Sequence, residues 1–313
     1  MRYEYEDFKD TITELVREHY TGEDGYTVKL NKVSKNNGIA LDGMTICSNQ
    51  SNVAPNIYLN FYYKDYENGV YESIEEVVDA IIKCYEVHRP TESFDVSCFS
   101  DFSKMKHLVR MKVLDKDMNE ELLKECPYFT YLNKLAVLFY IQLPSAEEGE
   151  YPTIAIRQEH LEMWGITKDE LLAVAKSQEN IDAEEYQIED MFSVLNGMLD
   201  IPEEMQPEFD CSGHMFVLTN SRKLNGASII LHLEYLESLA NKLNSSLYIL
   251  PSSIHECIAI AAPDGASEEN DYSQIQNLRE MIREVNRTQV QLMERLSDEL
   301  FYFDRTTKLL SIA

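Results

Sequence analysis

The sequence predicts an α+β protein of two mixed domains, the second a β-α-β-β-α-β-β sandwich of ferredoxin-like or profilin/PAS-like type. Hydrophobic residues make up 44% of the chain and charged residues 27%, the balance of a folded protein. Short alternating apolar runs are interspersed with segments of helical periodicity, which is typical of mixed folds. The length of 313 residues suggests about two domains, at roughly 100–200 residues each.

The first part of the chain reads as helices and strands in alternation. Phe8, Ile12 and Val16 share one face of a predicted helix, and Asn36-Asn37-Gly38 is a hairpin turn signal. Ser73 is a suitable N-cap for the helix that follows it. The expected elements are a helix at 5–18, strands at 26–33 and 39–47, a short helix through the aromatic run ending at Gly69, a helix at 73–88, a strand at 107–114, a helix at 117–125, strands at 135–143 and 152–157, and helices at 158–163 and 168–178.

The last hundred residues give the clearest pattern. Strands are expected at 215–218, 247–250, 257–260, 300–303 and 309–312, with helices at 227–243 and 272–295. The first six of these elements match a split βαβ arrangement. The helix at 272–295 carries a short heptad seam, which favours packing on its own sheet over dimerisation, so a monomer and a homodimer both remain open.

Acidic residues dominate the charge. The chain has 28 Lys and Arg against 55 Asp and Glu, a net charge of −27, which excludes general binding to nucleic acid or to an anionic membrane. Residues 144–210 hold 18 acidic and three basic residues, a net of −15. The stretch 200–213 has two prolines and no periodicity. It therefore predicts a linker between an N-terminal domain, 1–199, and a C-terminal domain, 214–313.

Standard cofactor and metal signatures are missing from the sequence. There is no G-x-G-x-x-G, P-loop or G-x-S-x-G pattern, so no cofactor is expected. The six cysteines form no C-x-x-C pair, and Cys211 with His214 would supply only half of a zinc site, so no metal is expected. The N-terminus lacks the apolar region of a signal peptide, which predicts a cytoplasmic protein with reduced thiols.

One loop holds the candidate catalytic residues. His255, between two predicted strands, could act as a general base, with Glu256 orienting it and Ser252 or Ser253 as nucleophile. The helical zinc-protease motif is excluded, because the position four residues after His255 is Ala259. The alternative is structural: the serines form turn hydrogen bonds and His255 satisfies backbone groups of the loop.

Two further groups are candidate binding residues. Exposed tyrosines suit protein recognition, although a cluster of them can equally form the core and rim of a domain. Arginines at i, i+4 and i+8 of the long helix could receive an acidic partner or a phosphate, or could pair with neighbouring glutamates. The tyrosines are Tyr58, Tyr62, Tyr63 and Tyr66, and the arginines are Arg279, Arg283 and Arg287.

Several segments together resemble a known family over nearly the whole chain. The most distinctive are Pro251-Ser252-Ser253-Ile254-His255-Glu256 and the ending that runs from Leu296-Ser297-Asp298-Glu299 to Asp304. Also similar are 33–46, 55–59, 217–220, 226–227 and 248–250. The chain resembles an uncharacterised domain family of bacterial proteins from anaerobic gut Gram-positives. The resemblance implies a bacterial, cytoplasmic protein, and it implies no activity, cofactor or catalytic residue.

Three functional hypotheses follow. The first is a non-enzymatic binding or regulatory module with an unknown protein partner, indicated by the missing catalytic signatures, the tyrosines and the acidic surface. The second is a hydrolase-like enzyme centred on His255. The third is an acidic mimic of nucleic acid, in which residues 144–210 meet a basic partner.

Overall fold

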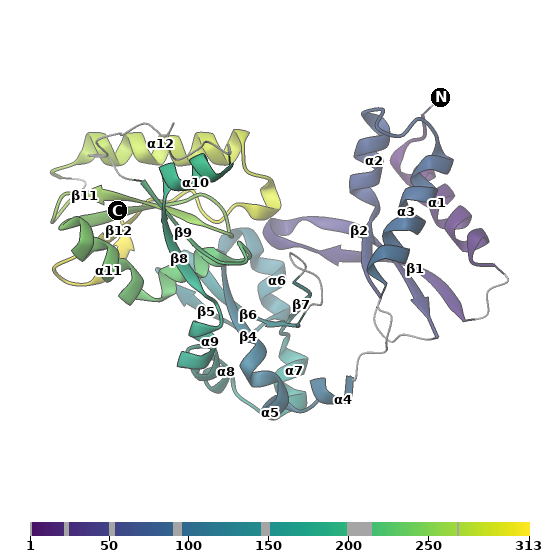
Figure 1. Cartoon of the computed structure of the whole chain (residues 1–313), viewed down its shortest axis with the longest axis horizontal. Coiled ribbons are helices and arrows are strands. Elements are labelled where there is room, and N and C mark those ends of the chain that lie inside the picture. The colour runs from purple at the N-terminus through teal and green to yellow at the C-terminus, as the bar shows by residue number, and fades with distance from the viewer. Residues whose placement is uncertain are drawn as a thin grey trace. The chain divides into compact units, whose positions relative to one another are not determined.

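A computed structural model describes residues 2–21, 25–49, 54–89, 96–144, 151–198, 215–267 and 269–313. Helices and antiparallel sheets are mixed throughout, which confirms the predicted α+β class (Figure 1). Contacts divide the chain into two units. The first consists of Met1–Lys35 and Ile39–Ser100, and the second of Asn36–Gly38 and Asp101–Ala313.

Three helices pack on a three-stranded sheet in the first unit. Its elements are α1 (Tyr5–His19), β1 (Tyr26–Ser34), β2 (Ala40–Ser48), β3 (Asn56–Tyr58), α2 (Leu59–Glu67), α3 (Ile74–His88) and α4 (Val96–Phe99). The register pairs Val28 with Ile46 and Met44 with Ile57, so these apolar side chains share the face that α1, α2 and α3 cover. The aromatic run therefore begins as a short strand, β3, before it becomes the predicted helix.

The second unit contains two sheets, the first built around a fully buried strand. Its early elements are η1 (Asn36–Gly38), α5 (Phe102–Met105), η2 (Lys106–Leu108), β4 (Val109–Asp115), η3 (Asp117–Asn119), α6 (Glu120–Glu125), β5 (Tyr128–Tyr131), β6 (Leu135–Gln142), β7 (Thr153–Ala155), α7 (Gln158–Trp164), α8 (Lys168–Ala175) and α9 (Gln178–Asp182). All eight residues of β6 are buried, and β6 pairs with β4, β5 and β7. A continuous apolar run is what a strand covered on both faces requires.

The second sheet of this unit has six strands in the order β13-β12-β10-β11-β9-β8. Its elements are β8 (Tyr186–Asp190), α10 (Met191–Met198), β9 (Met215–Asn220), η5 (Gly226–Leu231), α11 (Leu233–Leu243), β10 (Ser246–Pro251), β11 (Cys257–Ala262), α12 (Tyr272–Thr288), η6 (Leu292–Glu294), β12 (Phe301–Asp304) and β13 (Leu309–Ile312). This confirms the predicted β-α-β-β-α-β-β succession from β9 onward. In addition, β11 lies between β9 and β10, and β10 between β11 and β12, so both crossovers are split. In a ferredoxin-like sheet the first strand is central and the second lies at the edge. Here the second strand of the succession, β10, is central, so the strand order is not the ferredoxin-like one.

Helices lie on opposite sides of this second sheet (Figure 1). On one side, Ile275, Leu278 and Ile282 of α12 pack on Tyr248 and Tyr302 of the sheet. The seam of α12 therefore covers the chain's own sheet, as the sequence favoured. Leu236 and Ala240 of α11 are buried as well.

Two helices differ from their predicted extents. The predicted helix at 227–243 is a 3-10 helix, η5, followed by α11, because His232 at the junction has non-helical backbone angles. The predicted helix at 272–295 ends at Thr288, and Leu292 of the expected seam belongs to the separate turn η6 and is 39% exposed.

The unit boundary at Ser100–Asp101 lies far before the predicted linker. Residues 200–213 fall outside the described residues. On either side of them, β8 and β9 pair in one sheet, with Tyr186 opposite Asn220 and Asp190 opposite Phe216. Strand pairing of this kind joins residues 186–190 to the same unit as 215–313, although the intervening sequence has the composition of a linker.

Candidate functional site

His255, in the loop between β10 and β11, is held by hydrogen bonds from Asn225 and Thr219. Its Nδ1 accepts a hydrogen bond from the backbone N–H of Asn225, at 3.1 Å, and its carbonyl accepts one from Thr219 Oγ1, at 2.9 Å. Burial lowers the pKa of His255, which favours the neutral ring. With Nδ1 as the acceptor, the proton of the neutral ring lies on Nε2.

The two serines of this loop are engaged in its turn. Ser253 Oγ accepts from the His255 backbone N–H at 3.0 Å, and the Ser253 N–H donates to the Glu256 carbonyl at 3.1 Å. Ser252 Oγ lies 3.4 Å from Glu256 Oε1. A nucleophile must share a hydrogen bond with its base, and these contacts place no serine hydroxyl on the His255 ring. The arrangement matches the structural alternative better than the hydrolase.

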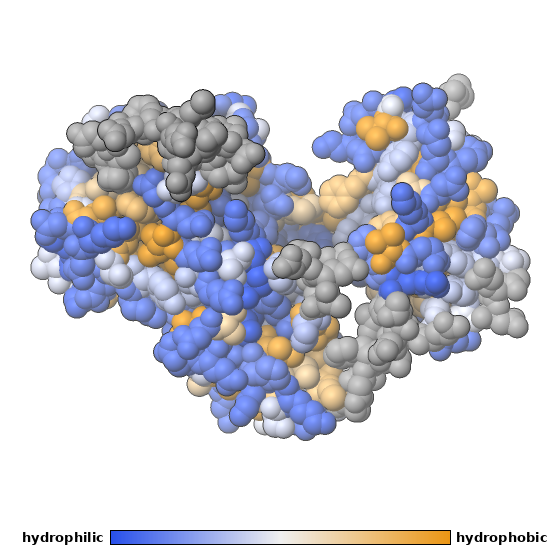
Figure 2. Space-filling model, in the orientation of Figure 1, coloured by the Kyte–Doolittle hydropathy of each residue, from blue (hydrophilic) through white to orange (hydrophobic). Residues whose placement is uncertain are grey.

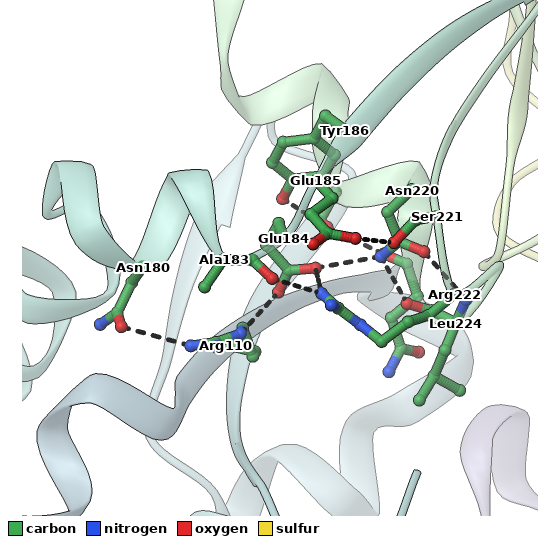
Figure 3. A network of polar contacts seen from close by, with 12 residues as sticks. Arg110, Asn180, Ala183, Glu184, Glu185, Tyr186, Asn220, Ser221, Arg222 and Leu224 are labelled. Carbon is green, nitrogen blue, oxygen red and sulfur yellow. Dashed lines mark hydrogen bonds and ion pairs between the residues drawn. The ribbon is translucent and has the colours of Figure 1, made fainter. Parts of the chain in front are cut away.

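A buried polar network joins the two sheets of the second unit (Figure 3). Glu184, just before β8, is 3% exposed, and its Oε2 accepts from Asn220 at 3.0 Å and from Arg222 at 3.2 Å. On its other side, Oε1 lies 3.6 Å from Nε of Arg110, which belongs to β4 in the first sheet of the unit. One carboxylate thus bridges Arg110, in β4 of the first sheet, and Arg222, in the turn that follows β9 of the second sheet.

The remaining groups of the network bind backbone. Arg110 donates to the carbonyls of His107 and Val109, both at 2.9 Å, and Arg222 donates to that of Ala183 at 2.8 Å. Burial raises the pKa of Glu184 above its ordinary value, and the two arginines oppose part of that shift. Neither cavity described below borders these side chains. The network therefore ties Arg110 of the first sheet to Glu184 and Arg222 beside the second.

The candidate tyrosines lie mainly in the core and rim of the first unit. Tyr66 is 5% exposed and belongs to the core, so it offers no surface to a partner. Tyr62 and Tyr63 pack partly buried against the same core, and Lys35 lies 4.3 Å from the ring centre of Tyr58. Of the two readings of this cluster, its burial fits core and rim.

The three arginines of α12 have three different environments despite their even spacing. Arg279 donates to the oxygen of Ala313, and Arg287 forms a two-point contact with Glu284, at 2.8 and 3.2 Å. Arg283 has no hydrogen bond or ion pair within the described ranges, and it lines a cavity of about 360 Å³. The sequence interpreted the three as equivalent, and only their surroundings separate them.

This cavity, which we call the polar cavity, is bordered by charged groups from four separate segments. Lys134, in the turn between β5 and β6, lies 2.8 Å from Asp117 and 3.9 Å from Asp115. Asp117 raises the pKa of Lys134, and Asp115 and Glu299 add to that shift. Lys134 therefore lies among three carboxylates.

Arg283, Arg295 and Asp298 also line the polar cavity. Arg295 uses Nε to donate to the Val290 carbonyl at 3.2 Å, and its two terminal nitrogens have no partner among the described residues. Asp298 accepts from Asn286 at 2.7 Å. Two guanidinium groups thus line the cavity and retain N–H donors without a partner among the described residues. Sequence reasoning missed Arg295 and Lys134; Asp298 and Glu299 lie in the distinctive ending of the resemblance.

A second cavity, of about 60 Å³, is apolar. It is bordered by Met281, Ile282 and Val285 of α12, by residues of β9, β10 and β11, and by Ser252 in the loop after β10. It offers almost no polar group, and the His255 ring does not border it.

Metal and membrane features were also sought. Over the described ranges no three His, Cys, Asp or Glu side chains are grouped to hold a metal ion, and Cys211 with His214 lies outside those ranges. None of the described helices has both the length and the apolar composition that a membrane crossing requires. Within the acidic segment 144–210, Glu184 is buried between arginines and Glu170 caps α8 through Thr167, so its carboxylates have different roles.

The hydropathy of the surface is mixed, with apolar residues scattered among polar ones on the face shown in Figure 2. No curated protein and no solved structure matches the chain significantly. A family model does match, over residues 5–305, and its description is a family of unknown function, DUF5688. Because this match spans nearly the whole chain, the protein belongs to the DUF5688 family.

Proposed function

We propose that this chain is a non-enzymatic binding protein whose ligand is a small charged molecule held in the polar cavity. The observation that carries the proposal is Arg283, whose guanidinium borders the cavity without a hydrogen bond or ion pair among the described residues. A volume of about 360 Å³ falls within the range of ligand pockets, roughly 300–1,000 Å³. Arginine is suited to bind carboxylate or phosphate groups through two parallel hydrogen bonds.

The chemistry around the cavity favours binding over catalysis. Lys134 is held by Asp117 in an ion pair, and Ser297 Oγ accepts from the backbone N–H of Glu299 at 3.1 Å. These contacts supply fixed charges and no nucleophile paired with a base.

A cytoplasmic location is part of the proposal. Its support is that four cysteines, Cys47, Cys84, Cys126 and Cys257, are free thiols, as expected in a reducing compartment. Recovery of the protein in the membrane or secreted fraction of its cells would contradict this location.

The proposal is tested by thermal unfolding of the full chain in the presence of mixtures of amino acids, small carboxylates, phosphate esters and short peptides. A ligand at about 100 times its Kd stabilises the folded state by about 2.7 kcal/mol. For a unit of this size that is a rise in melting temperature of roughly 5–10 °C.

The matched variants are Arg283→Ala and Arg287→Ala, on the same face of α12. Arg287 pairs with Glu284 and does not border the cavity. We expect the shift to be lost with Arg283→Ala and kept with Arg287→Ala. If no mixture shifts the melting temperature, or if the shift survives Arg283→Ala, the cavity is not the binding site.

A further inference from the structure

Charges of both signs line the polar cavity: Lys134, Arg283 and Arg295 are cationic, and Asp115, Asp117, Asp298 and Glu299 are anionic. Arg283 and Arg295 provide guanidinium nitrogens that have no partner among the described residues. Around Lys134, the three carboxylates of Asp115, Asp117 and Glu299 outnumber the single ammonium. A cavity that accepted only an anion would not need this excess of carboxylates, because each one repels an anionic ligand.

Glu299 is the carboxylate best placed to meet a cation from outside. Asp117 is bonded to Lys134 at 2.8 Å, and Asp115 accepts from the backbone N–H groups of Asp117 and Met118 at 2.9 and 3.0 Å. The carboxylate of Glu299 has neither a hydrogen bond nor an ion pair within the described ranges, although it acts on Lys134 through space. A ligand ammonium could therefore pair with Glu299 without displacing an internal contact.

The size of the cavity limits the ligand. One water occupies about 30 Å³ of liquid, so about 360 Å³ corresponds to roughly a dozen water-sized groups. That is room for a molecule with about a dozen non-hydrogen atoms, the size of a dipeptide of small residues.

We infer that the ligand is a zwitterion of dipeptide size, with a free carboxylate bound by Arg283 and Arg295 and a free ammonium bound by Glu299. This inference rests on the proposed function, since it names the ligand class for the same cavity. Both charged ends are recognised, so a compound that lacks either end loses one set of ion pairs. Hydrogen bonds to charged groups contribute about 1.5–3 kcal/mol each, which corresponds to a loss of tenfold or more in affinity.

The test is isothermal titration of the full chain with alanyl-alanine, its N-acetyl derivative, its C-terminal amide and inorganic phosphate. We expect alanyl-alanine to bind and either blocked form to bind at least tenfold more weakly. Arg283→Ala should weaken the binding of the free dipeptide. It should have little further effect on the binding of the amide, because the amide has no carboxylate for Arg283 to bind. Glu299→Gln should weaken the binding of the free dipeptide. It should have little further effect on the binding of the N-acetyl form, because that form has no ammonium group for Glu299 to bind.

Arg287→Ala is the control and should leave all four titrations unchanged. Binding of phosphate or of the N-acetyl dipeptide as tightly as the free dipeptide, with loss in Arg283→Ala, would overturn the zwitterion and leave the cavity as an anion site. If none of these four probes binds while a mixture in the thermal experiment does so through Arg283, the ligand class is wrong and the proposed function stands. If neither experiment shows binding that depends on Arg283, both fail.

Discussion

Neutralising Glu184 should destabilise the second unit far more than neutralising its neighbour Glu185. Glu184 is 3% exposed and lies between Arg110, itself 7% exposed, and Arg222. The variant Glu184→Gln leaves the buried charge of Arg110 and the partly buried charge of Arg222 without a counter-ion, and losing one partner of a buried ion pair costs about 3–5 kcal/mol. Both arginines keep their bonds to backbone carbonyls, so we expect the lower end, about 3 kcal/mol.

Glu185 provides the matched control. It is exposed and accepts a hydrogen bond from Ser221, which a glutamine oxygen can also accept. We expect Glu185→Gln to change the stability by about 0.5 kcal/mol or less. The same substitution at a buried and at an exposed position thus separates the effect of burial on stability from the effect of the side-chain change itself.

The assay is urea unfolding followed by the fluorescence of Trp164, the single tryptophan of the chain, which lies in the second unit. With a slope of about 3 kcal/mol per molar urea, a loss of about 3 kcal/mol moves the midpoint down by about 1 M. In the double variant Glu184→Gln with Arg222→Gln, the cost should be less than the sum of the single costs, because the second change removes one orphaned charge. Equal midpoints for the two single variants, or additive costs in the double variant, would refute the idea of a bridging carboxylate.

Two other predictions concern the second unit. Gly226→Ala should cost about 1–3 kcal/mol or more by overpacking, since an added Cβ would lie 2.6 Å from the His255 carbonyl oxygen and 2.7 Å from the Asn220 backbone nitrogen. In the control variant Gly265→Ala the added Cβ meets no atom within 4 Å, but the residue has a φ of +72°, so the cost should be only about 1–2 kcal/mol. Equal urea midpoints for the two variants would contradict the steric argument. Burial lowers the pKa of His232 and His255 below 6.5, so the unfolded chain takes up protons there before the folded one does, and stability should fall as the pH drops below 6.5. Urea midpoints at pH 7.5 and 5.5 check this; His232→Gln should reduce the difference, and a midpoint that rises on acidification would show the opposite linkage.

Much of the secondary structure follows from local sequence. The unbroken apolar run at 135–141 predicts a buried strand, and β6 is buried at every position, including Gln142 at its end. Ser73 and Thr167 predict the starts of α3 and α8, because their hydroxyls accept from N–H groups three residues later. The junction at His232 was not predicted, since the apolar spacing of 227–243 fits one helix and the break lies in backbone angles that this spacing does not reveal.

The candidate site divides differently. Arg283 was identified from its spacing on α12, which made it look equivalent to Arg279 and Arg287. In the structure Arg279 binds Ala313 and Arg287 binds Glu284, whereas Arg283 borders a cavity whose other lining residues lie in distant turns. Lys134 and Arg295 had no local signal, since each is one basic residue in a turn. For the catalytic candidates, the sequence could place Ser252, Ser253 and His255 in one loop, but not show which of their atoms the turn itself uses.

By itself, the sequence determined the helices and strands that carry a clear apolar period or cap, and the succession of the last seven elements, because periodicity and capping act over a few neighbouring residues. It did not predict β3, β5, β8 or α10. It also determined the net charge of −27, but charge counting treats all carboxylates alike. Only the tertiary structure decided that Glu184 is a buried bridge between two sheets and that Glu299 borders a cavity. The energy of a charge depends on its solvation and on its nearest counter-charges, and residues far apart in the sequence provide both.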